Sequence, residues 1–314
     1  MRESYSFKSR DEKGTEIHGV KWTPDDGNIR AVIQLNHGMI EYIERYDEFA
    51  NFLCNHGFAV YGHDHIGHGE SVSSPADWGI MHTDTPSDTM VEDMLSNYKI
   101  VKAAHPDLPY FILGHSMGSY LLRKFLSVKA KDLQGVNGAI IMGTGTVADG
   151  AINAGMFVVN MISKIKGRDH KSKMVEGLMF DSNYKKYDVT GKDPDNSWLS
   201  KNVENVKKYY SDPKDTFAFS VNGYKVLLEC TGYDNKPANI EKMNKDMPIL
   251  FVSGTDDPVG AMGKGVEAAY RKFKDAGIKD VTLRLFENDR HEILNETDRD
   301  KVYEEILSWM ESRM

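Results

Sequence analysis

The sequence pattern that most clearly suggests a catalytic reaction is a serine flanked by glycines. Residues 114–118 read Gly-His-Ser-Met-Gly; they follow a short apolar run, 110–113, and open an amphipathic stretch, 116–128. A serine on a tight turn from strand to helix is exposed, and small neighbours allow close backbone approach. Free backbone N–H groups and the positive end of the helix dipole then face an oxyanion that forms there. The pattern therefore predicts that Ser116 is a nucleophile.

A serine nucleophile needs a histidine to accept its proton and a carboxylate to orient that histidine. In folds that alternate strands and helices these groups follow in the chain order Ser, acid, His. Of the 11 histidines, His291 alone lies beyond the last two strand-like segments. Two adjacent aspartates end the strand before it. We expect Asp257, which precedes a rigid proline, to be the acid, with Asp256 as the alternative.

An oxyanion formed in acyl transfer needs two N–H donors. One is expected from the backbone of Met117, which follows the nucleophile. The second should come from the loop after the strand-like run 31–36, where Met39 follows a His-Gly pair. We assign it to the backbone N–H of Met39. Without Ser116, the same loop would be interpreted as an ordinary turn that ends a strand.

Alternating apolar runs and amphipathic stretches are expected to position these residues. Strands are expected at 5–8, 16–22, 31–36, 58–61, 110–113, 138–142, 248–253 and 281–286, and helices at 46–56, 90–104, 116–128, 265–276 and 299–311. Such alternation is typical of parallel strands joined by helical crossovers. The sequence therefore predicts an α/β fold with a mostly parallel sheet and helices on both faces.

The alternation stops between about residues 150 and 240, where helical segments rich in Lys, Tyr and Asn replace it. This stretch has a net charge of +3, whereas the rest of the chain has −11. We therefore expect one core, residues 1–149 and 241–314, interrupted by a helical cap, residues 150–240. Because the insertion follows the strand after the nucleophile helix, it should cover the mouth of the site.

Composition excludes several classes of protein. With 314 residues, 40% of them hydrophobic and 27% charged, the chain is neither disordered nor fibrous. Its net charge of −8 argues against nucleic acid as a partner, because neutralising phosphates needs a basic surface. The most apolar stretch, 151–165, is interrupted by polar residues and is too short to span a bilayer, so we expect no membrane-spanning segment.

Two features bear on the compartment. The first eight residues alternate polar and apolar types and lack the apolar run of a secretory leader. Cys54 and Cys230 are the only cysteines, too few for a disulfide framework. We therefore expect two free thiols and a cytoplasmic location. Oligomeric state cannot be read from the sequence.

Residues 63–68, His-Asp-His-Ile-Gly-His, raise a metal alternative, because metallohydrolases use a His-x-His-x-Asp-His motif after a strand to bind zinc. Gly67 replaces the aspartate of that motif. Further ligands, and groups that would support a metal-activated water, are not evident in the sequence. We therefore expect neither a metal nor another cofactor.

Five segments carry a shared pattern: 37–41 (HGMIE), 62–71 (GHDHIGHGES), 114–118 (GHSMG), 254–257 (GTDD) and 290–291 (RH). Together they resemble the monoacylglycerol lipase, lysophospholipase and serine aminopeptidase S33 group of α/β-hydrolases, over about residues 5–310. The resemblance implies an α/β-hydrolase fold with a cap. The triad that it implies is Ser116, Asp257 and His291, with oxyanion donors at Met39 and Met117.

The same resemblance assigns roles around the triad. Glu41 and Arg45 match polar positions that organise the alcohol side of the pocket in the lipase branch. Asp64 and His68 would make structural hydrogen bonds beneath the site. Leu294 stands where lipases of the group often carry a second histidine, which weakens the case for glycerol recognition.

The start of the expected cap is almost wholly apolar from residue 151 to 162. It forms either the cap's own core or one wall of an acyl pocket. Met156 and Phe157 suit the pocket, because such side chains repack around flexible chains. Cationic residues follow at positions 164, 166, 168, 171 and 173; they form either a solvated loop or a surface for transient contact with anionic lipid.

These expectations combine into one function, a serine carboxylic ester hydrolase that works through an acyl-enzyme on Ser116. By resemblance, its substrate is a small ester or lipid of the monoacylglycerol or lysophospholipid type. A serine aminopeptidase of the same fold is the alternative, and a non-catalytic ligand receptor is a third class. Esters are favoured because an aminopeptidase needs carboxylates to hold a substrate ammonium, whereas the expected cap is net positive and begins apolar.

Overall fold

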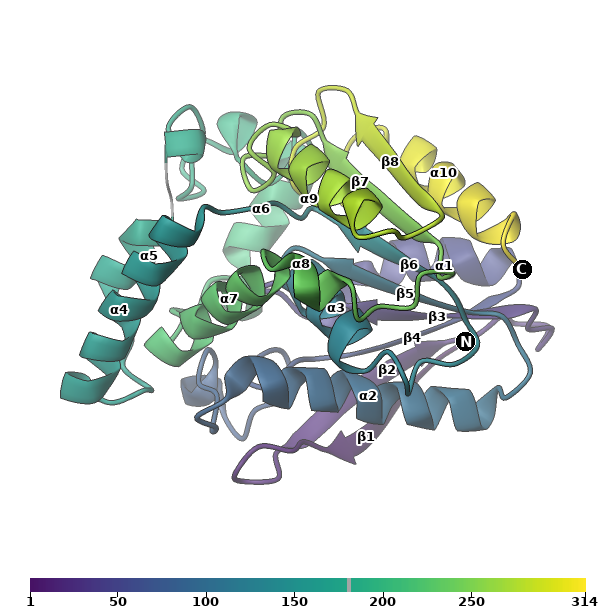
Figure 1. Ribbon diagram of the computed structural model, residues 1–314, viewed down its shortest axis with the longest axis horizontal. Helices are drawn as coiled ribbons and strands as arrows, with labels where there is room; N and C mark the ends of the chain where they lie inside the picture. The colour runs from purple at the N-terminus through teal and green to yellow at the C-terminus, as the bar shows by residue number, and fades with distance from the viewer. Residues whose placement is uncertain (180–181) are drawn as a thin grey trace.

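One mixed sheet organises the residues that this computed structural model describes, 1–179 and 182–314. Its eight strands lie in the order β1-β2-β4-β3-β5-β6-β7-β8 (Figure 1). Their bounds are β1 Arg2–Lys8, β2 Glu16–Trp22, β3 Ala31–Asn36, β4 Phe58–His63, β5 Tyr110–His115, β6 Val136–Met142, β7 Ile249–Gly254 and β8 Val281–Phe286. β1 and β2 pair antiparallel, and the neighbours from β4 to β8 pair in parallel. The predicted mostly parallel sheet is confirmed.

The central strand β5 leads to Ser116. It pairs with β3 and β6, and all of its residues are buried. Strands covered on both faces are continuous apolar runs, which is why 110–113 stands out in the sequence. The carboxyl ends of parallel strands meet at one edge of the sheet, so the loops after β3, β5, β7 and β8 converge. These loops carry Met39, Ser116, Asp257 and His291.

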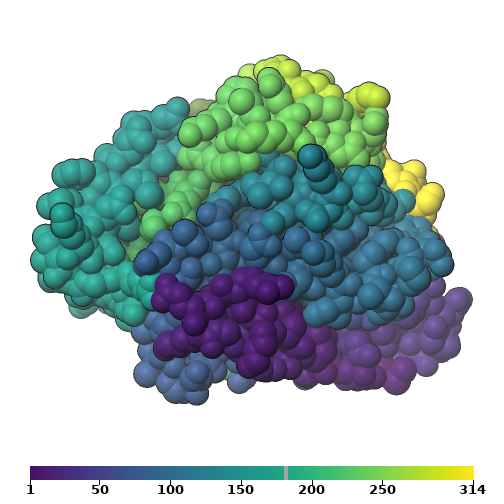
Figure 2. Space-filling view, turned by 60° about the horizontal axis from the view of Figure 1, so that its bottom comes forward, coloured from purple at the N-terminus to yellow at the C-terminus, as the bar shows by residue number. Residues whose placement is uncertain are grey.

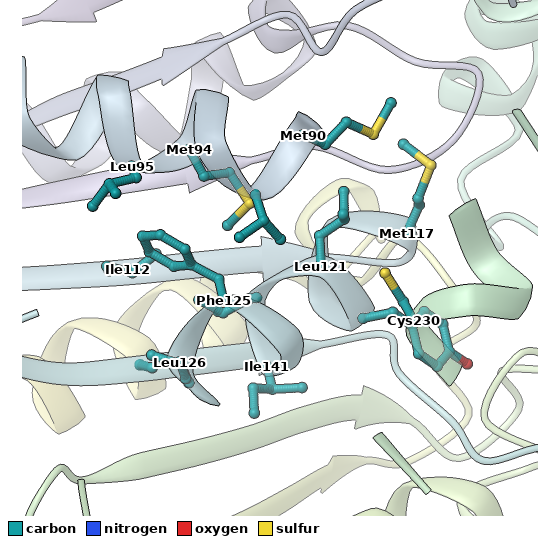
Figure 3. Packing of buried hydrophobic residues seen from close by; sticks show 14 of the residues in the cluster. Met90, Met94, Leu95, Ile112, Met117, Leu121, Phe125, Leu126, Ile141 and Cys230 are labelled. Carbon is teal, nitrogen blue, oxygen red and sulfur yellow. The ribbon is translucent and has the colours of Figure 1, made fainter. Parts of the chain in front are cut away.

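Helices cover both faces of the sheet. α1 (Asp47–Asn55) and α10 (Arg299–Glu311) pack on one face; α2 (Pro86–Ala104), α3 (Met117–Val128) and α9 (Lys264–Asp275) pack on the other. Each helix turns an apolar stripe inward. Figure 3 shows part of the larger cluster, with labelled side chains Met90, Met94, Leu95, Ile112, Met117, Leu121, Phe125, Leu126, Ile141 and Cys230.

In the part of the chain that the structure describes, the α-helices between β6 and β7 are α4 (Asp149–Lys166), α5 (Lys173–Met179), α6 (Val203–Ser211), α7 (Val221–Asp234) and α8 (Pro237–Ile240). Short 3-10 helices lie at Ile43–Tyr46, Pro75–Asp77, Ser182–Tyr184, Pro194–Asn196, Pro213–Asp215 and Ile293–Asn295. α7 packs on α2 and α3, and its Tyr224, Val226 and Cys230 join the main apolar cluster. The inserted residues are therefore anchored in the core through α7.

α4 and α5 form a lobe at the left edge of the molecule in Figures 1 and 2. On α4, Ile152 and Val159 are buried, whereas Phe157 is 67% exposed. The apolar stretch at the start of the insertion thus contributes some side chains to packing and leaves others on the surface. None of the helices within residues 1–179 and 182–314 has both the length and the hydrophobicity needed to cross a bilayer.

Candidate active site

Ser116 occupies a strained turn between β5 and α3. Its backbone lies at φ 51° and ψ −120°, a region that residues with a side chain rarely adopt. The Ser116 backbone N–H donates to the Met142 carbonyl at 3.0 Å, which ties the turn to the end of β6. Its hydroxyl does not cap the helix that follows. The turn therefore presents the hydroxyl for chemistry rather than for capping.

The two flanking glycines are required by close backbone contacts. A Cβ at Gly114 would lie 2.3 Å from the Gly118 carbonyl oxygen. A Cβ at Gly118 would lie 2.2 Å from the Asn36 carbonyl oxygen. Both separations are far below van der Waals contact, so a larger residue would push the turn away from β3. The predicted role of the glycines therefore has a direct structural basis.

His291 and Asp257 lie together at the ends of β8 and β7. The His291 Nδ1 atom is 3.1 Å from each carboxylate oxygen of Asp257. Asp257 also accepts hydrogen bonds from the Ser253 hydroxyl at 3.0 Å and the Val259 backbone N–H at 2.9 Å. Burial opposes ionisation of Asp257, but His291 and these donors lower its pKa. An ionised carboxylate in this position fixes the imidazole tautomer.

Asp256, the alternative acid, is turned differently. It is half-buried, and its backbone carbonyl accepts a hydrogen bond from the Tyr187 hydroxyl at 2.8 Å. Of the two aspartates, Asp257 is the one that contacts His291. This geometry favours Asp257 as the acid.

The His291 ring lies against the strand end that holds Ser116. A Cβ at Gly143 would lie 3.1 Å from His291 Cε1, and Gly143 follows Met142, whose carbonyl accepts from Ser116. The loops after β5, β6 and β8 therefore bring Ser116 and His291 to the same place.

The loop after β3 lies directly on the nucleophile. A Cβ at Gly38 would lie 2.9 Å from the Ser116 Cβ. Met117 is the first residue of α3, where a backbone N–H has no acceptor within the helix, and Met39 follows Gly38 on the loop beside it. Two free donors beside a nucleophile can stabilise an oxyanion.

Glu41 supports this loop from beneath. Its carboxylate accepts hydrogen bonds from the Gly38 backbone N–H and the Tyr46 hydroxyl, and it lies 3.0 Å from His115 Nδ1. Burial opposes ionisation, but the charge and hydrogen bond of His115 and the charge of Arg45 lower the pKa of Glu41. Burial also opposes protonation of His115, yet Glu41 raises the pKa of its imidazole. The pair is therefore an ionic support for the loop.

Arg45 links Glu41 to the histidine loop. Its guanidinium contacts Glu41 at 3.0 Å and binds both oxygens of Glu292 at 2.7 and 2.9 Å. It also lies 3.4 Å from Asp215 and 4.9 Å from the Tyr209 ring centroid. Burial raises the pKa of Asp215 to about 8, although Arg45 acts against the rise. A buried ion pair that is bound on both sides in this way fixes the positions of the loops that it joins.

The four expected substrate-binding residues have different surroundings. Glu41 is buried and the Arg45 side chain is 7% exposed; both are occupied by intramolecular partners, beside a small cavity that Leu294 and Glu292 also line. Met156 is half-buried on α4. Phe157 faces solvent, so this structure does not place it in the acyl pocket that we expected it to line. The physical reason is helical phase, because the buried side of α4 follows Ile152 and Val159.

The histidine-rich segment is packed rather than arranged around an ion. Asp64 accepts from the backbone N–H groups of Ile43 at 2.7 Å and Glu70 at 2.8 Å. The His68 Nδ1 atom lies 3.0 Å from the Ile66 carbonyl oxygen. Among the described residues, no group of three or more His, Cys, Asp or Glu side chains could hold a metal ion. This geometry gives the zinc alternative no support.

Three contributors to the site were not anticipated. His115 connects Glu41 to the His291 carbonyl, at 3.3 Å, and Glu292 binds Arg45. Trp198, from the inserted residues, stacks on His291 with ring centroids 5.1 Å apart. The position of Glu292 next to His291 could have suggested its role, whereas the sequence around Trp198 carries no comparable signal.

Strand order, the strained serine turn and the adjacent His-Asp pair define the class of protein, a serine-type α/β-hydrolase. The chain belongs to the serine aminopeptidase S33 family, whose model matches residues 27–298. It is 27% identical to the monoglyceride lipase of Mus musculus over 299 residues, a match that covers 93% of this chain and 86% of that protein. It is 26% identical to the monoacylglycerol lipase of Mycolicibacterium smegmatis over 302 residues, covering 96% and 95%.

Solved structures agree with this assignment. A highly thermostable carboxyl esterase from Bacillus coagulans, in complex with glycerol, has a TM-score of 0.88 and 29% identity; the match covers 99% of this chain and 98% of that chain. A soluble variant of the Saccharomyces cerevisiae monoglyceride lipase shares the fold, with a TM-score of 0.74, 20% identity and coverage of 99% and 95%. The predicted fold and enzyme class are confirmed: the chain is a hydrolase, and its relatives group it with the serine ester hydrolases.

Proposed function

We propose that this chain hydrolyses carboxylic esters of the monoacylglycerol type through an acyl-enzyme on Ser116. The observation that carries the proposal is the juxtaposition of a strained serine turn with the buried His291–Asp257 pair. An unstrained turn would bury the hydroxyl, and an isolated histidine would lack a fixed tautomer. The two features together favour a nucleophile with its base.

In the first step, Ser116 Oγ attacks the ester carbonyl carbon while His291 Nε2 takes the hydroxyl proton. Collapse of the tetrahedral intermediate breaks the bond to the alcohol oxygen, which receives that proton from the imidazolium. Water, deprotonated by the same nitrogen, then attacks the acyl carbon; the bond to Ser116 Oγ breaks, Oγ takes the proton back from the imidazolium, and the acid is released. Asp257 holds Nδ1–H and stabilises the imidazolium in both steps.

The N–H groups of Met39 and Met117 bind the carbonyl oxygen as it becomes negative. Glu41 acts on this part of the site indirectly, because its carboxylate holds the Gly38 N–H at the base of the loop. Donors that are held in place before the reaction need no reorganisation when charge develops. Glu41 and Arg45 are therefore proposed as positioning residues of the oxyanion loop and of the alcohol side.

An aminopeptidase would need a carboxylate that is available for the substrate ammonium. Glu41 and Glu292 are buried carboxylates on the loops around Ser116, and both are bound by Arg45. Binding a second cation would require breaking those buried pairs, which is expensive. This pairing supports an ester as the substrate.

A panel of p-nitrophenyl esters and aminoacyl p-nitroanilides tests the proposal. We expect kcat/KM for esters to rise with acyl length until the pocket is full, because each buried methylene contributes about 0.8 kcal/mol. Preference for the anilides, after correction for intrinsic reactivity, would favour the aminopeptidase. Covalent labelling of wild type but not Ser116→Ala by a fluorophosphonate would separate an enzyme from a ligand receptor.

Residues 150–240 are proposed as a cap whose outer helices touch lipid surfaces. The apolar side chains Phe157, Met161 and Ile165 follow one another at helical spacing on α4 and are exposed by 67%, 45% and 72%. Met174 and Leu178 repeat the pattern on α5 and are also exposed. Such apolar stripes, with lysines beside them, suit the interface of an anionic membrane.

The cations of this segment divide into two groups. Lys164, Lys166, Lys171 and Lys173 are exposed. Arg168 instead binds Glu12 at 2.7 Å and Asp84 at 2.5 Å, so it ties the cap to the core. The lysines are therefore the proposed lipid contacts, and Arg168 is removed from that set.

Cys54 and Cys230 are both free and buried. Thiols without disulfides are typical of reducing compartments. This usage supports the proposal of a cytoplasmic location.

A further inference from the structure

The His291 ring contacts two other aromatic rings. The Trp198 ring is nearly parallel to it, with centroids 5.1 Å apart and an interplanar angle of 28°. The His115 ring has its centroid 4.7 Å away at an angle of 37°. The Trp198 ring therefore stacks on the imidazole, and the His115 ring packs beside it at a steeper tilt. Asp257 meanwhile occupies the Nδ1 edge.

Trp198 is held by the loop that carries His291. The Arg290 guanidinium donates to the backbone carbonyls of Asp195 at 3.2 Å and Ser200 at 3.3 Å, and also to that of Ser197. These carbonyls lie on both sides of Trp198 in the chain. One side chain next to His291 therefore fixes the backbone on which Trp198 stands.

A second set of hydrogen bonds joins the same two segments. The Glu292 backbone N–H donates to the Leu199 carbonyl at 2.8 Å. The Glu296 carboxylate accepts from the backbone N–H groups of Lys201, at 3.0 Å, and Arg290, at 2.9 Å. The Trp198 side chain itself packs against a small apolar cluster of Leu199, Val206 and Tyr209. Residues 195–201 and the histidine loop are thus one hydrogen-bonded unit.

We propose that Trp198 is a positioning residue for His291, which rests on the proposed role of His291 as the base. The stacked indole restrains the tilt of the imidazole plane, with the His115 ring packed beside it. With Nδ1 held by Asp257, the orientation of the stacked ring sets the direction of Nε2. A residue of the inserted segment therefore completes the geometry of the core triad.

The alternative role for Trp198 is direct binding of the substrate. The two roles predict different kinetics. Removing a side chain that binds the substrate equally in the ground state and the transition state raises KM, whereas a mispositioned base lowers kcat. Displacement of a catalytic group by about 1 Å costs on the order of 100-fold in rate.

The test replaces Trp198 by Leu and by Phe, with Trp78→Leu and Trp78→Phe as matched controls. Trp78 is also half-buried and also stacks on an aromatic ring, Phe217, at 28°. We expect Trp198→Leu to lower kcat about 10- to 100-fold with KM changed less than about 3-fold, because the imidazole is no longer restrained on that face. Trp198→Phe keeps an aromatic face and should stay within about 5-fold of wild type. Both Trp78 variants should stay near wild type.

The rate of Ser116 labelling by a fluorophosphonate gives a second readout, measured on variants with wild-type circular dichroism. It should fall in parallel with kcat in Trp198→Leu and recover in Trp198→Phe. An unchanged kcat, a change confined to KM, or equal losses in Leu and Phe variants would overturn the proposal. If Trp198→Leu does not fold, a loss of kcat in Trp198→Phe beyond about 5-fold overturns it, because that variant retains the stack. Wild-type protein that resists labelling would instead overturn the proposed function.

Discussion

Charged and apolar side chains are distributed in opposite ways at the carboxyl edge of the sheet and on the outer face of α4 and α5. At the sheet edge, Glu41, Arg45 and Glu292 are charged groups that are buried and paired. On the outer helices, apolar side chains such as Phe157 and Ile165 are exposed. Burying ions requires partners in fixed positions, whereas exposing apolar groups requires a surface to receive them. The comparison assigns chemistry to the first region and contact with other molecules to the second.

The two regions also differ in how they are connected. The sheet edge joins four loops through hydrogen bonds and ion pairs, so a change in one loop is transmitted to the others. α4 rests on α7 along one side, where Ile152 and Val159 are buried, and it also contacts the neighbouring outer helix α5. Substitutions at the sheet edge should therefore affect catalysis and folding, whereas those on outer α4 should affect surface binding alone. The following predictions test that division, from the largest effect to the smallest.

Replacement of the nucleophile should give the largest loss. Ser116→Ala should lower kcat for a soluble p-nitrophenyl ester by about 10³-fold or more, approaching about 10⁶-fold if the triad acts as a unit as in subtilisin. The fold should persist, which circular dichroism will check. Residual activity in purified Ser116→Ala at wild-type level would mean that another group performs the chemistry.

The two adjacent aspartates should behave very differently. Asp257→Asn should lower kcat by up to about 10⁴-fold, the loss known for the orienting aspartate of the chymotrypsin-type triad. Asp256→Asn is the matched control, since its contact with Tyr187 is made by the backbone carbonyl. Its kcat should stay within about 10-fold of wild type. Equal losses, or a reversed order, would move the acid to Asp256.

Removing the central cation of the buried network should destabilise the fold. Arg45→Met leaves Glu41 and Glu292 buried without their shared partner, a change that typically costs about 3–5 kcal/mol. Arg271→Met removes an exposed pair with Glu267 and should cost less than about 1 kcal/mol. Urea unfolding of both variants measures the difference. Similar stabilities would show that the network does not hold the loops together.

Acid should weaken the fold through buried histidines. Burial lowers the pKa of His63 to about 3, against 6.5 for an ordinary histidine. Between these pKa values, His63 is protonated in the unfolded chain but neutral in the folded chain. The free energy of unfolding therefore falls as the pH drops below about 6.5. Each such histidine contributes a slope of about 1.4 kcal/mol per pH unit. His63→Leu should flatten the urea stability profile between pH 6 and pH 4 by that amount, and an unchanged slope would contradict a neutral buried His63.

Substitutions on the outer face of α4 should have the smallest effect on catalysis. Phe157→Ser combined with Ile165→Ser should leave kcat for a soluble ester unchanged but reduce binding to vesicles of phosphatidylcholine and phosphatidylglycerol by about 10-fold or more. The control is Ile100→Ser with Val128→Ser, two exposed apolar residues on α2 and α3. Vesicle cosedimentation measures the loss. Equal effects in the two double variants would remove the special role of α4.

Much of the fold could be predicted from local pattern. Apolar runs such as 31–36 and 58–61 coincide with β3 and β4, because strands buried between helices need no polar face. The serine turn could also be predicted from local sequence. Its glycines at 114 and 118 are demanded by backbone contacts within the turn and with the adjacent β3, which a short motif can specify. The order of the strands pointed to His291 and to the Asp256–Asp257 pair, and the proline after Asp257 favoured that residue.

Other features depended on the tertiary structure, because they join residues far apart in the chain. The pairing of Arg45 with Glu292 and the stacking of Trp198 on His291 arise from the meeting of separate loops. The periodicity of apolar residues along the chain does not indicate which loops meet in the folded protein. The residue type alone likewise did not show whether Phe157 is buried or exposed. An apolar residue on a helix is buried only if it lies on the side that another element covers. The sequence by itself thus determined the strands, the serine turn and the chain order of the proposed triad. Packing of the inserted segment on the core decided what surrounds them.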